Sequence, residues 1–200
     1  MKGFTLWFTG LPCSGKSTLA ERVLGILLER GMNAELLDGD EVRRNLSKGL
    51  GFSKEDRDTN IRRIGYVCKL LSRNGVAAIA AAISPYRAIR EENRKAIERY
   101  VEVYVKAPVE VLIERDIKGM YKKALAGEIE NFTGISDPYE EPENPEILVE
   151  SDKETVEEST AKIIRTLELM GLVPGAPAES EYSEEEEAKI KARLEDLGYL

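Results

Sequence analysis

The sequence predicts an α/β fold of three layers, in which a mainly parallel, five-stranded sheet lies between two layers of helices. Three observations lead to this prediction. Short apolar runs alternate with segments of helical periodicity along most of the chain. A glycine-rich segment at residues 10–17 separates the first apolar run from the first helical pattern. The length of 200 residues and the hydrophobic content of 42% suffice for one well-packed domain.

Each predicted element has its own pattern. Five apolar runs predict strands at residues 4–9, 34–38, 76–83, 101–106 and 146–150. Helical spacing of apolar residues predicts helices near 16–30, 41–48, 54–74, 87–99, 108–115 and 153–170. Sheets of this kind bind ligands beyond the carboxyl ends of their strands, so we expect functional residues directly after the strands.

The segment 115–145 interrupts this alternation. It is rich in glycine, proline and charged residues. A segment of this length inside a domain is typical of a functional loop or of disorder. We interpret it as a mobile lid with a short basic helix, within a domain that spans residues 1–173.

Residues 174–200 form an acidic tail. This tail holds eight acidic and three basic residues, so most of the net charge of −8 lies there. A helical pattern over 183–197 places Ile190, Leu194 and Leu197 in one apolar stripe, and we expect this helix to pack back on the domain or on a partner. Nothing in the charge pattern indicates a basic surface for nucleic-acid polymers.

Composition excludes several other classes of protein. The chain has no histidine, which excludes His-based catalysis and His metal ligation. Cys13 and Cys68 have neither the number nor the spacing of a disulfide framework or a zinc site, which favours the cytoplasm. No apolar stretch approaches the roughly 20 residues of a membrane span. Met1–Gly3 lead directly into the first strand, so we expect neither a membrane anchor nor a secretory signal.

Residues 10–17 match the phosphate-binding loop, or P-loop, G-x-x-x-x-G-K-[ST]. They read Gly10, Leu11, Pro12, Cys13, Ser14, Gly15, Lys16 and Ser17. In such a loop, backbone N–H groups and a helix N-terminus bind phosphate oxygens, Lys16 reaches the β- and γ-phosphates, and Ser17 can ligate Mg²⁺. The alternative, a chance glycine-rich turn, is disfavoured by the strand before it and the helix after it. We therefore expect ATP and Mg²⁺ as cofactors.

Asp38-Gly39-Asp40 ends the second predicted strand, at the expected mouth of the site. Asp40 can accept a hydroxyl proton or orient Mg²⁺, and Arg43, one helical turn away, can hold an anion. The alternative is that Asp40 only caps a helix that starts at Glu41. Both roles are compatible.

A second pair of polar residues lies on the helix predicted at 54–74. Arg57 and Asn60 are three residues apart and share a face, which suggests an edge that binds the phosphoryl acceptor. The alternative, a solvated charged helix, fits Arg62 and Arg63 better than Arg57.

Ile83-Ser84-Pro85 follows the third predicted strand, where a ligand-contacting loop is expected. Ser84 can offer its hydroxyl and a backbone N–H group to an anionic substrate. The alternative is a helix cap at Ser84, with Pro85 in the first helical turn.

Together these motifs resemble the adenylylsulfate kinase family over about residues 4–150. The matching segments include Gly10 to Thr18, Leu37 to Asp40 with Val42-Arg43, Gly51 to Ser53, Glu55 to Arg57, Asn60 to Gly65, Ile83 to Arg87, Lys118-Gly119 with Tyr121 to Ala124, Gly127 to Ile129, Phe132 to Ile135, Asp137 to Tyr139 and Pro142 to Pro145. The P-loop alone is shared by a very large superfamily. The Ile-Ser-Pro-Tyr-Arg and Phe-Thr-Gly-Ile segments, in this order, are much more specific.

The resemblance implies a P-loop kinase-type fold and transfer of the ATP γ-phosphoryl group to the 3′-hydroxyl of adenylylsulfate. The product is 3′-phosphoadenylylsulfate, the activated sulfate donor. It further implies that Phe52 and Phe132 sandwich the adenine of adenylylsulfate. Lys118, Lys122 or Lys123 would bring positive charge to the phosphates when the lid closes.

The complete set of implied site residues is as follows. Lys16, Asp40 and Ser84 are catalytic; ATP binds residues 10–17, Thr18 and Arg115; Ser17 and Asp38 hold the metal; adenylylsulfate binds Asp40, Arg43, Phe52, Arg57, Asn60, Ile83, Ser84, Lys118, Phe132, Thr133 and Gly134. Ser84 matches the family's phosphoserine position. No His or Lys base is evident beside it, and direct in-line transfer needs only positioning and charge stabilisation, so we expect direct transfer.

The chain departs from the usual family pattern at Pro12-Cys13, at Ala81-Ala82 and at Ile117, and the last of these lies in the lid. Two other functions stay open at this point. One is a small-molecule P-loop kinase for a different hydroxyl acceptor. The other is a nucleotide-binding scaffold without turnover, which the presence of Lys16, Ser17 and Asp40 disfavours. We expect a homodimer.

Overall fold

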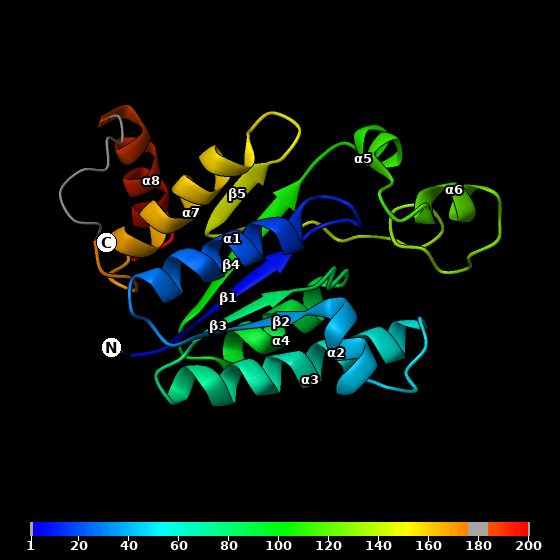
Figure 1. Ribbon diagram of the computed structural model, residues 1–200, viewed down its shortest axis with the longest axis horizontal. Coiled ribbons are helices and arrows are strands. Elements are labelled where there is room, and N and C mark those ends of the chain that lie inside the picture. Colours follow the sequence, from blue (N-terminus) through cyan, green and yellow to red (C-terminus); the bar gives the residue numbers. More distant parts are fainter. Residues whose placement is uncertain (1, 176–183, 200) are drawn as a thin grey trace.

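Five parallel strands form the centre of the protein, in the order β2-β3-β1-β4-β5 (Figure 1). The computed structural model describes residues 2–175 and 184–199. The strands are β1 (Phe4–Thr9), β2 (Ala34–Asp38), β3 (Ala77–Ala81), β4 (Tyr100–Lys106) and β5 (Ile147–Glu150). All four strand pairings are parallel, which confirms the predicted sheet. The carboxyl ends of all five strands therefore lie at one edge of the sheet.

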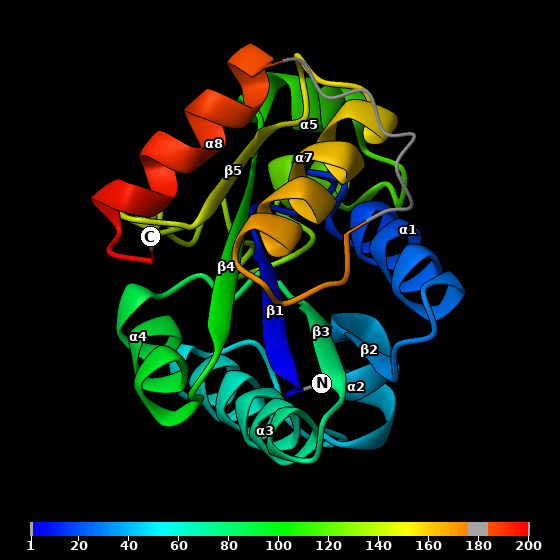
Figure 2. The same cartoon turned by 90° about the vertical axis from the view of Figure 1, so that its left-hand side faces the viewer.

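Helices cover both faces of the sheet. The helices of the described ranges are α1 (Lys16–Glu29), α2 (Gly39–Asn45), α3 (Lys54–Arg73), α4 (Arg87–Ala96), α5 (Val109–Arg115), α6 (Met120–Leu125), α7 (Val156–Leu169) and α8 (Glu184–Asp196). Figure 2 shows α1 and α7 on one face and α3 and α4 on the other. The three predicted layers are therefore present. No helix in the described ranges combines the length and the apolarity needed to cross a membrane.

The core explains why β1, with the sequence FTLWFT, is buried along its whole length. Phe4, Leu6 and Phe8 pack in the cluster that includes α1 and α7, while Trp7 packs in the cluster under α3 and α4. Side chains alternate between the two faces of a strand, and helices bury both faces here. β1 lies in the centre of a sheet that is covered on both sides, so neither of its faces is exposed to solvent.

Several predicted boundaries differ from those in the structure. The helix predicted at 87–99 ends at Ala96, because Ile97 adopts an extended backbone (φ −112°, ψ 121°) and the chain turns directly into β4 at Tyr100. The strand predicted at 76–83 is only Ala77–Ala81. The helix predicted from residue 41 begins earlier, at Gly39.

The 115–145 segment shares a small hydrophobic cluster with α5 and the P-loop. Tyr121 and Phe132 pack edge-to-face with ring centroids 5.0 Å apart, within a cluster that also holds Leu112. The Tyr121 hydroxyl donates to Pro12 O in the P-loop at 3.1 Å. The predicted short basic helix is α6, which carries Lys122 and Lys123. Figure 1 shows this segment beyond the carboxyl ends of the strands, next to the P-loop side of the molecule.

The tail helix α8 packs back on the domain, one of the two predicted arrangements. Leu194 is fully buried, and Ile190 and Leu197 are half-buried. Arg193 donates to Pro145 O at 2.9 Å, and the Tyr199 hydroxyl donates to Glu146 at 3.0 Å. The helix predicted at 183–197 is thus found at Glu184–Asp196, and residues 176–183 of the predicted tail lie outside the described residues.

Candidate active site

The P-loop joins β1 to α1 with the geometry of an anion site. Gly10, Cys13 and Gly15 have φ of 147°, 61° and 102°, so the backbone curls back on itself. A Cβ at Gly10 would come within 2.3 Å of Val105 O, so this position requires glycine. Gly15 precedes α1 without a capping side chain, so the first N–H groups of the helix stay available for an anionic ligand.

Lys16 lies folded into the P-loop. Its Nζ donates to Leu11 O at 2.7 Å and to Ser14 Oγ at 3.4 Å. The pKa of Lys16 is lowered to about 8, mainly by burial; the nearby Lys118 adds to the shift, and Cys13, Asp38 and Asp40 partly oppose it. A phosphate group in the loop would restore full charge to this lysine.

Asp38 connects the P-loop to the end of β2. Its Oδ2 accepts a 2.7 Å hydrogen bond from Ser17 Oγ, and its Oδ1 accepts one of 2.9 Å from the backbone N–H of Asp40. Asp38 is therefore the cap of α2, and the alternative that Asp40 caps this helix is wrong. The reason is that α2 begins at Gly39, which lies so close to β3 that a Cβ there would be 3.2 Å from Ala81 O.

The carboxylate of Asp40 is thus free for another contact, and it forms an ion pair with Lys118. Both side chains are about two-thirds exposed, at 67% and 65%. The hydrogen bond to Asp40 raises the pKa of Lys118. This pair joins the first turn of α2 to the 115–145 segment across the mouth of the P-loop.

Arg57 joins α3 to the same segment from the other side. It donates to Thr133 Oγ1 and Asn131 O, and it lies 3.4 Å from Asp137. Its Nε also donates to Phe52 O at 2.8 Å. Arg57 and Thr133, both predicted to bind the substrate, are therefore in direct contact although they are 76 residues apart in the chain.

Asn60, one turn along α3, is 5% exposed, and its Oδ1 has no hydrogen-bond partner among the described residues. A buried acceptor without a partner costs free energy, so this position suits a ligand that supplies a donor. Phe52 is 57% exposed, and the Arg43 guanidinium lies 4.4 Å from its ring centroid. Arg43 itself donates to Gly51 O at 2.9 Å. Phe132, in contrast, is buried against Tyr121.

Ser84 does not cap α4, which was the alternative role predicted for it. It is 1% exposed, has φ of 42°, and its Oγ accepts from Trp7 Nε1 and donates to Thr9 Oγ1, both at 3.0 Å. The hydroxyl thus points toward β1, away from α4. The residue before α4 is Tyr86, and α4 begins at Arg87, so Pro85 is not in its first turn.

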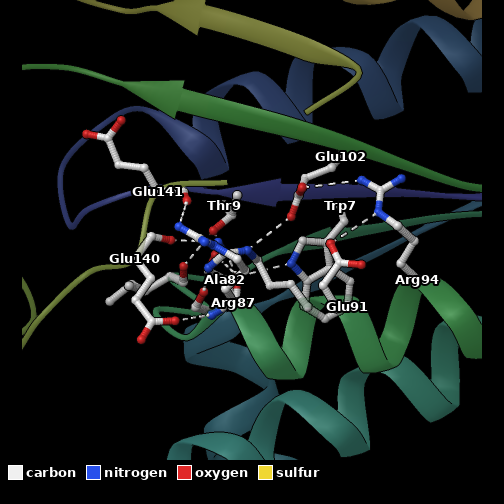
Figure 3. A network of polar contacts seen from close by, with 12 residues as sticks. Trp7, Thr9, Ala82, Arg87, Glu91, Arg94, Glu102, Glu140 and Glu141 are labelled. Atoms are coloured by element: carbon white, nitrogen blue, oxygen red, sulfur yellow. Dashed lines mark hydrogen bonds and ion pairs between the residues drawn. The ribbon is translucent and has the colours of Figure 1, made fainter. Parts of the chain in front are cut away.

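Figure 3 shows what caps α4 in place of Ser84: Glu140 lies beside the N-terminus of α4, near Arg87. The Arg87 N–H donates to Glu140 Oε2 at 2.6 Å, and the Glu140 N–H donates to Pro85 O at 2.8 Å. The cap therefore comes from a segment more than 50 residues away. Local sequence could not identify it.

The remaining predicted residues surround the loop. Thr18 is exposed in the first turn of α1, and Ile83 O accepts from Thr9 Oγ1 at 2.8 Å. A Cβ at Gly134 would be 2.7 Å from the Leu11 side chain, so this glycine allows close packing on the P-loop. Arg115 donates to Ser151 O at 2.5 Å, which holds it at the end of β5.

One group of charged residues next to the site was not predicted. Arg90 and Arg94 on α4 contact Glu102 on β4, and Arg94 also pairs with Glu146 at 2.5 Å. Figure 3 shows Glu102 close to Trp7 and Arg94. A glutamate in an otherwise apolar run, Val101-Glu102-Val103, was the signal in the sequence: a charge in a buried strand needs a partner.

The sequence and the fold are both similar to those of known kinases. The sequence profile described as adenylylsulphate kinase matches residues 2–150. An adenylyl-sulfate kinase of Rippkaea orientalis is 59% identical over 170 residues, which cover 85% of this chain and 94% of that protein. A probable bifunctional SAT/APS kinase 2 of Sorangium cellulosum is 64% identical over 174 residues, but these cover only 30% of its length. An APS kinase of Mycobacterium tuberculosis, solved in complex with AMPPNP and APS, has a TM-score of 0.80 at 42% identity and covers 84% of this chain and 98% of that one.

Proposed function

Because the chain belongs to the adenylylsulfate kinase family, we propose a residue-by-residue account of how it phosphorylates adenylylsulfate, or APS. The chain is an adenylyl-sulfate kinase of sulfate activation and uses ATP. The γ-phosphoryl group passes to the 3′-hydroxyl of APS, which gives 3′-phosphoadenylylsulfate and ADP. Residues 1–173 form the kinase domain, with residues 115–145 as its lid.

One observation carries the residue assignment: the Asp40–Lys118 ion pair lies close enough to Lys16 in the P-loop to influence the pKa of that lysine. We assign Lys16 to the β- and γ-phosphates, where its charge opposes the charge that develops on the transferred group. Asp40 accepts the proton of the attacking hydroxyl. Asp40 holds Lys118 before substrate binds. When the 3′-hydroxyl of APS takes the place of Lys118 beside Asp40, Lys118 becomes free to contact the phosphates.

Mg²⁺ fits the donor set beside the P-loop. Ser17 Oγ and the Asp38 carboxylate lie 2.7 Å apart and offer hard oxygen ligands of the type that Mg²⁺ prefers. When bound with ATP, the ion would neutralise negative charge on the β- and γ-phosphates. The second oxygen of Asp38 stays fixed by the Asp40 N–H, so the carboxylate is oriented before ATP arrives.

We assign the APS pocket to the space between α3, the loop after β3 and the lid. Asn60 supplies the buried acceptor, and Phe52 supplies an exposed ring on which a purine can stack. Arg43 supplies positive charge next to that ring. The rest of the pocket wall consists of Ile83, Arg57, Phe132, Thr133 and Gly134. Arg57 acts partly by holding Thr133 in place.

Ser84 serves as a positioning residue in this account. Its hydroxyl is buried and bonded to Trp7 and Thr9, which supports direct transfer from ATP to APS. In-line transfer needs positioning and charge stabilisation and no covalent enzyme intermediate.

The experiment that tests the function is product analysis after incubation with MgATP and APS. We expect ADP and 3′-phosphoadenylylsulfate in equal amounts, identified by mass spectrometry and by the 3′ position of the new phosphate. Adenosine 5′-monophosphate, sugars and shikimate serve as alternative acceptors. Faster turnover of any of these would assign the chain to a different small-molecule kinase, and ATP binding without turnover would assign a scaffold role.

We also propose that the enzyme acts as a homodimer in the cytoplasm. The number and spacing of its cysteines favour a reducing compartment, and its two described thiols are unpaired. Sedimentation of the full chain measures the first property, and fractionation of cells that express it measures the second.

A further inference from the structure

Arg90 on α4 is a charged side chain in the core. It is 2% exposed, and its partner Glu102 on β4 is 3% exposed. Arg90 Nε lies 3.1 Å from Glu102 Oε1. Removing such a pair from water costs about as much free energy as the attraction between the charges returns. Stability alone therefore does not account for this arginine.

The other two guanidinium nitrogens of Arg90 hold two loops. Nη1 donates to Ser84 O and Nη2 donates to Glu140 O, each at 2.6 Å. The first carbonyl belongs to the loop after β3, and the second belongs to the end of the lid. A guanidinium group is planar and directs its N–H groups at fixed angles, so it sets the distance between two acceptors in a way that an ammonium group cannot. Figure 3 shows the network between Glu140 and Glu102, with Thr9 between them.

Ser84 needs such a support. Its φ of 42° lies in the left-handed region, which is costly for a residue with a Cβ and persists where the surroundings fix it. Trp7 and Thr9 fix the hydroxyl, and Arg90 fixes the carbonyl. Arg90 thus completes the set of contacts that hold this backbone conformation.

Glu102 in turn orients Arg90. Its carboxylate lies between Arg90 and Arg94, and Arg94 Nη2 is 3.3 Å from its second oxygen. Burial raises the pKa of Glu102, and the two arginines oppose that shift. The backbone N–H of Glu102 donates to Glu146 at 2.7 Å, so the strand that carries the carboxylate is itself fixed.

We propose that Arg90, oriented by Glu102, is a positioning residue for APS: it locks the Ser84 loop and the Tyr139–Glu141 end of the lid into one wall of the APS pocket. This inference rests on the proposed function, because that function makes the two loops a substrate wall. Arg90 acts through Ser84 and Glu140 and touches neither the P-loop nor the phosphates.

The test compares Arg90→Lys with a matched control, Arg94→Lys. Both variants keep the positive charge beside Glu102. Only the first loses the two-carbonyl contact, because the other ion pairs of Arg94 are with Glu91 and Glu146. We expect Arg90→Lys to raise KM for APS at least tenfold while KM for ATP stays within twofold. Arg94→Lys should leave both KM values within twofold.

A third variant, Glu102→Gln, tests the orienting role in a double-mutant cycle. We expect it to raise KM for APS less than Arg90→Lys does, and the double variant to be no worse than Arg90→Lys alone. An unchanged KM for APS in a folded Arg90→Lys variant would overturn the proposal. Equal increases in KM for APS and ATP would overturn it as well, because they indicate a general structural loss.

A readout that needs no activity separates this inference from the proposed function. Amide hydrogen exchange of the free protein should become at least tenfold faster at Glu140, whose N–H donates to Pro85 O, in Arg90→Lys but not in Arg94→Lys. If wild-type protein does not phosphorylate APS, the proposed function fails, and this exchange rate still decides whether Arg90 holds the two loops together. Unchanged exchange at Glu140 would show that it does not.

Discussion

The indole N–H of Trp7 donates a 3.0 Å hydrogen bond to the hydroxyl of Ser84, 77 residues away. Both side chains are buried, and Ser84 donates in turn to Thr9 Oγ1. The Ser84 hydroxyl thus has both its donor and its acceptor functions used inside the protein. This arrangement fits a residue that shapes the substrate loop better than one that carries a phosphoryl group.

Ser84→Ala should therefore remain active, with turnover reduced about 10- to 100-fold through poorer positioning of APS. The loss of the acceptor also leaves the buried Trp7 N–H without a partner, which costs about 1–3 kcal/mol of folding stability. Steady-state kinetics and thermal unfolding measure the two effects. Trp7 is the only tryptophan of the chain, so its emission reports the change directly. A phosphoenzyme labelled at Ser84, and discharged by APS at the rate of turnover, would contradict this prediction.

ATP binding should weaken above pH 8. Burial holds the pKa of Lys16 at about 8, so this side chain is mostly charged at pH 7 and loses its proton as the pH rises through 8. The phosphates need the charged form, so the dissociation constant for ATP should rise by up to about tenfold per pH unit above 8. Calorimetry between pH 7 and 9.5 measures it. Lys16→Arg keeps its charge over this range, and an equal loss of affinity in that variant would exclude Lys16 as the cause.

Asp40→Asn should lower kcat by about 10²–10⁴-fold and leave ATP affinity nearly unchanged, because the carboxylate acts on the acceptor hydroxyl. The cap of α2 is Asp38, so the fold should survive the change. Glu41→Gln, the neighbouring carboxylate on α2, is the control and should keep full activity. A normal kcat combined with lower stability would reduce Asp40 to a structural residue.

Asn60→Ala should weaken APS binding by about 1–3 kcal/mol, since the buried Oδ1 has no partner within residues 2–175 and 184–199 and would gain one from the ligand. Arg57→Ala should weaken it by a similar amount, because Thr133 and Asp137 lose their anchor. Equilibrium binding of APS and of ATP to each variant separates the two pockets. Weaker ATP binding with normal APS binding would mean that these residues line the ATP pocket and that our assignment of the two pockets is reversed.

The sequence predicted the elements well, because period and motif are local properties. Alternation of apolar runs predicted all five strands, and the glycine spacing predicted the P-loop. Residues 38–40 show the limit of this reasoning. The sequence alone allowed Asp40 to be the helix cap, whereas the start of α2 at Gly39 gives that role to Asp38.

Contacts between distant segments could not be predicted. Arg90 reads as one of several charged residues on a polar helix, yet it is buried because Glu102 lies opposite on β4. Glu140 caps α4 from a segment 53 residues away. Only the topology of the sheet brings these groups together, and a single sequence carries no signal for such pairs beyond the unusual glutamate in β4.

The tail should contribute stability and leave the chemistry in place. Leu194 is fully buried, and α8 is fixed by Arg165–Glu187 at 2.6 Å and by Arg193 on Pro145 O. These contacts lie on α7 and before β5, away from the carboxyl ends of the strands. Leu194→Ala should cost about 2–5 kcal/mol, which lowers the melting temperature by on the order of 10 °C.

Truncation after residue 175 should lower the melting temperature by a similar amount to Leu194→Ala. Its kcat and both KM values should stay within twofold of those of the full chain. Leu148→Ala is a matched control, because this leucine on β5 is 44% exposed and its loss should change the melting temperature little. Sedimentation of the full and truncated proteins shows whether α8 also supports self-association. In the described part of the tail, Leu194 is buried, Ile190 and Leu197 are half-buried, and Glu187 pairs with Arg165, so we expect identical sedimentation. A shift from dimer to monomer would assign it to the dimer contact, and loss of turnover in a truncated protein that still folds would mean that the tail acts on the site.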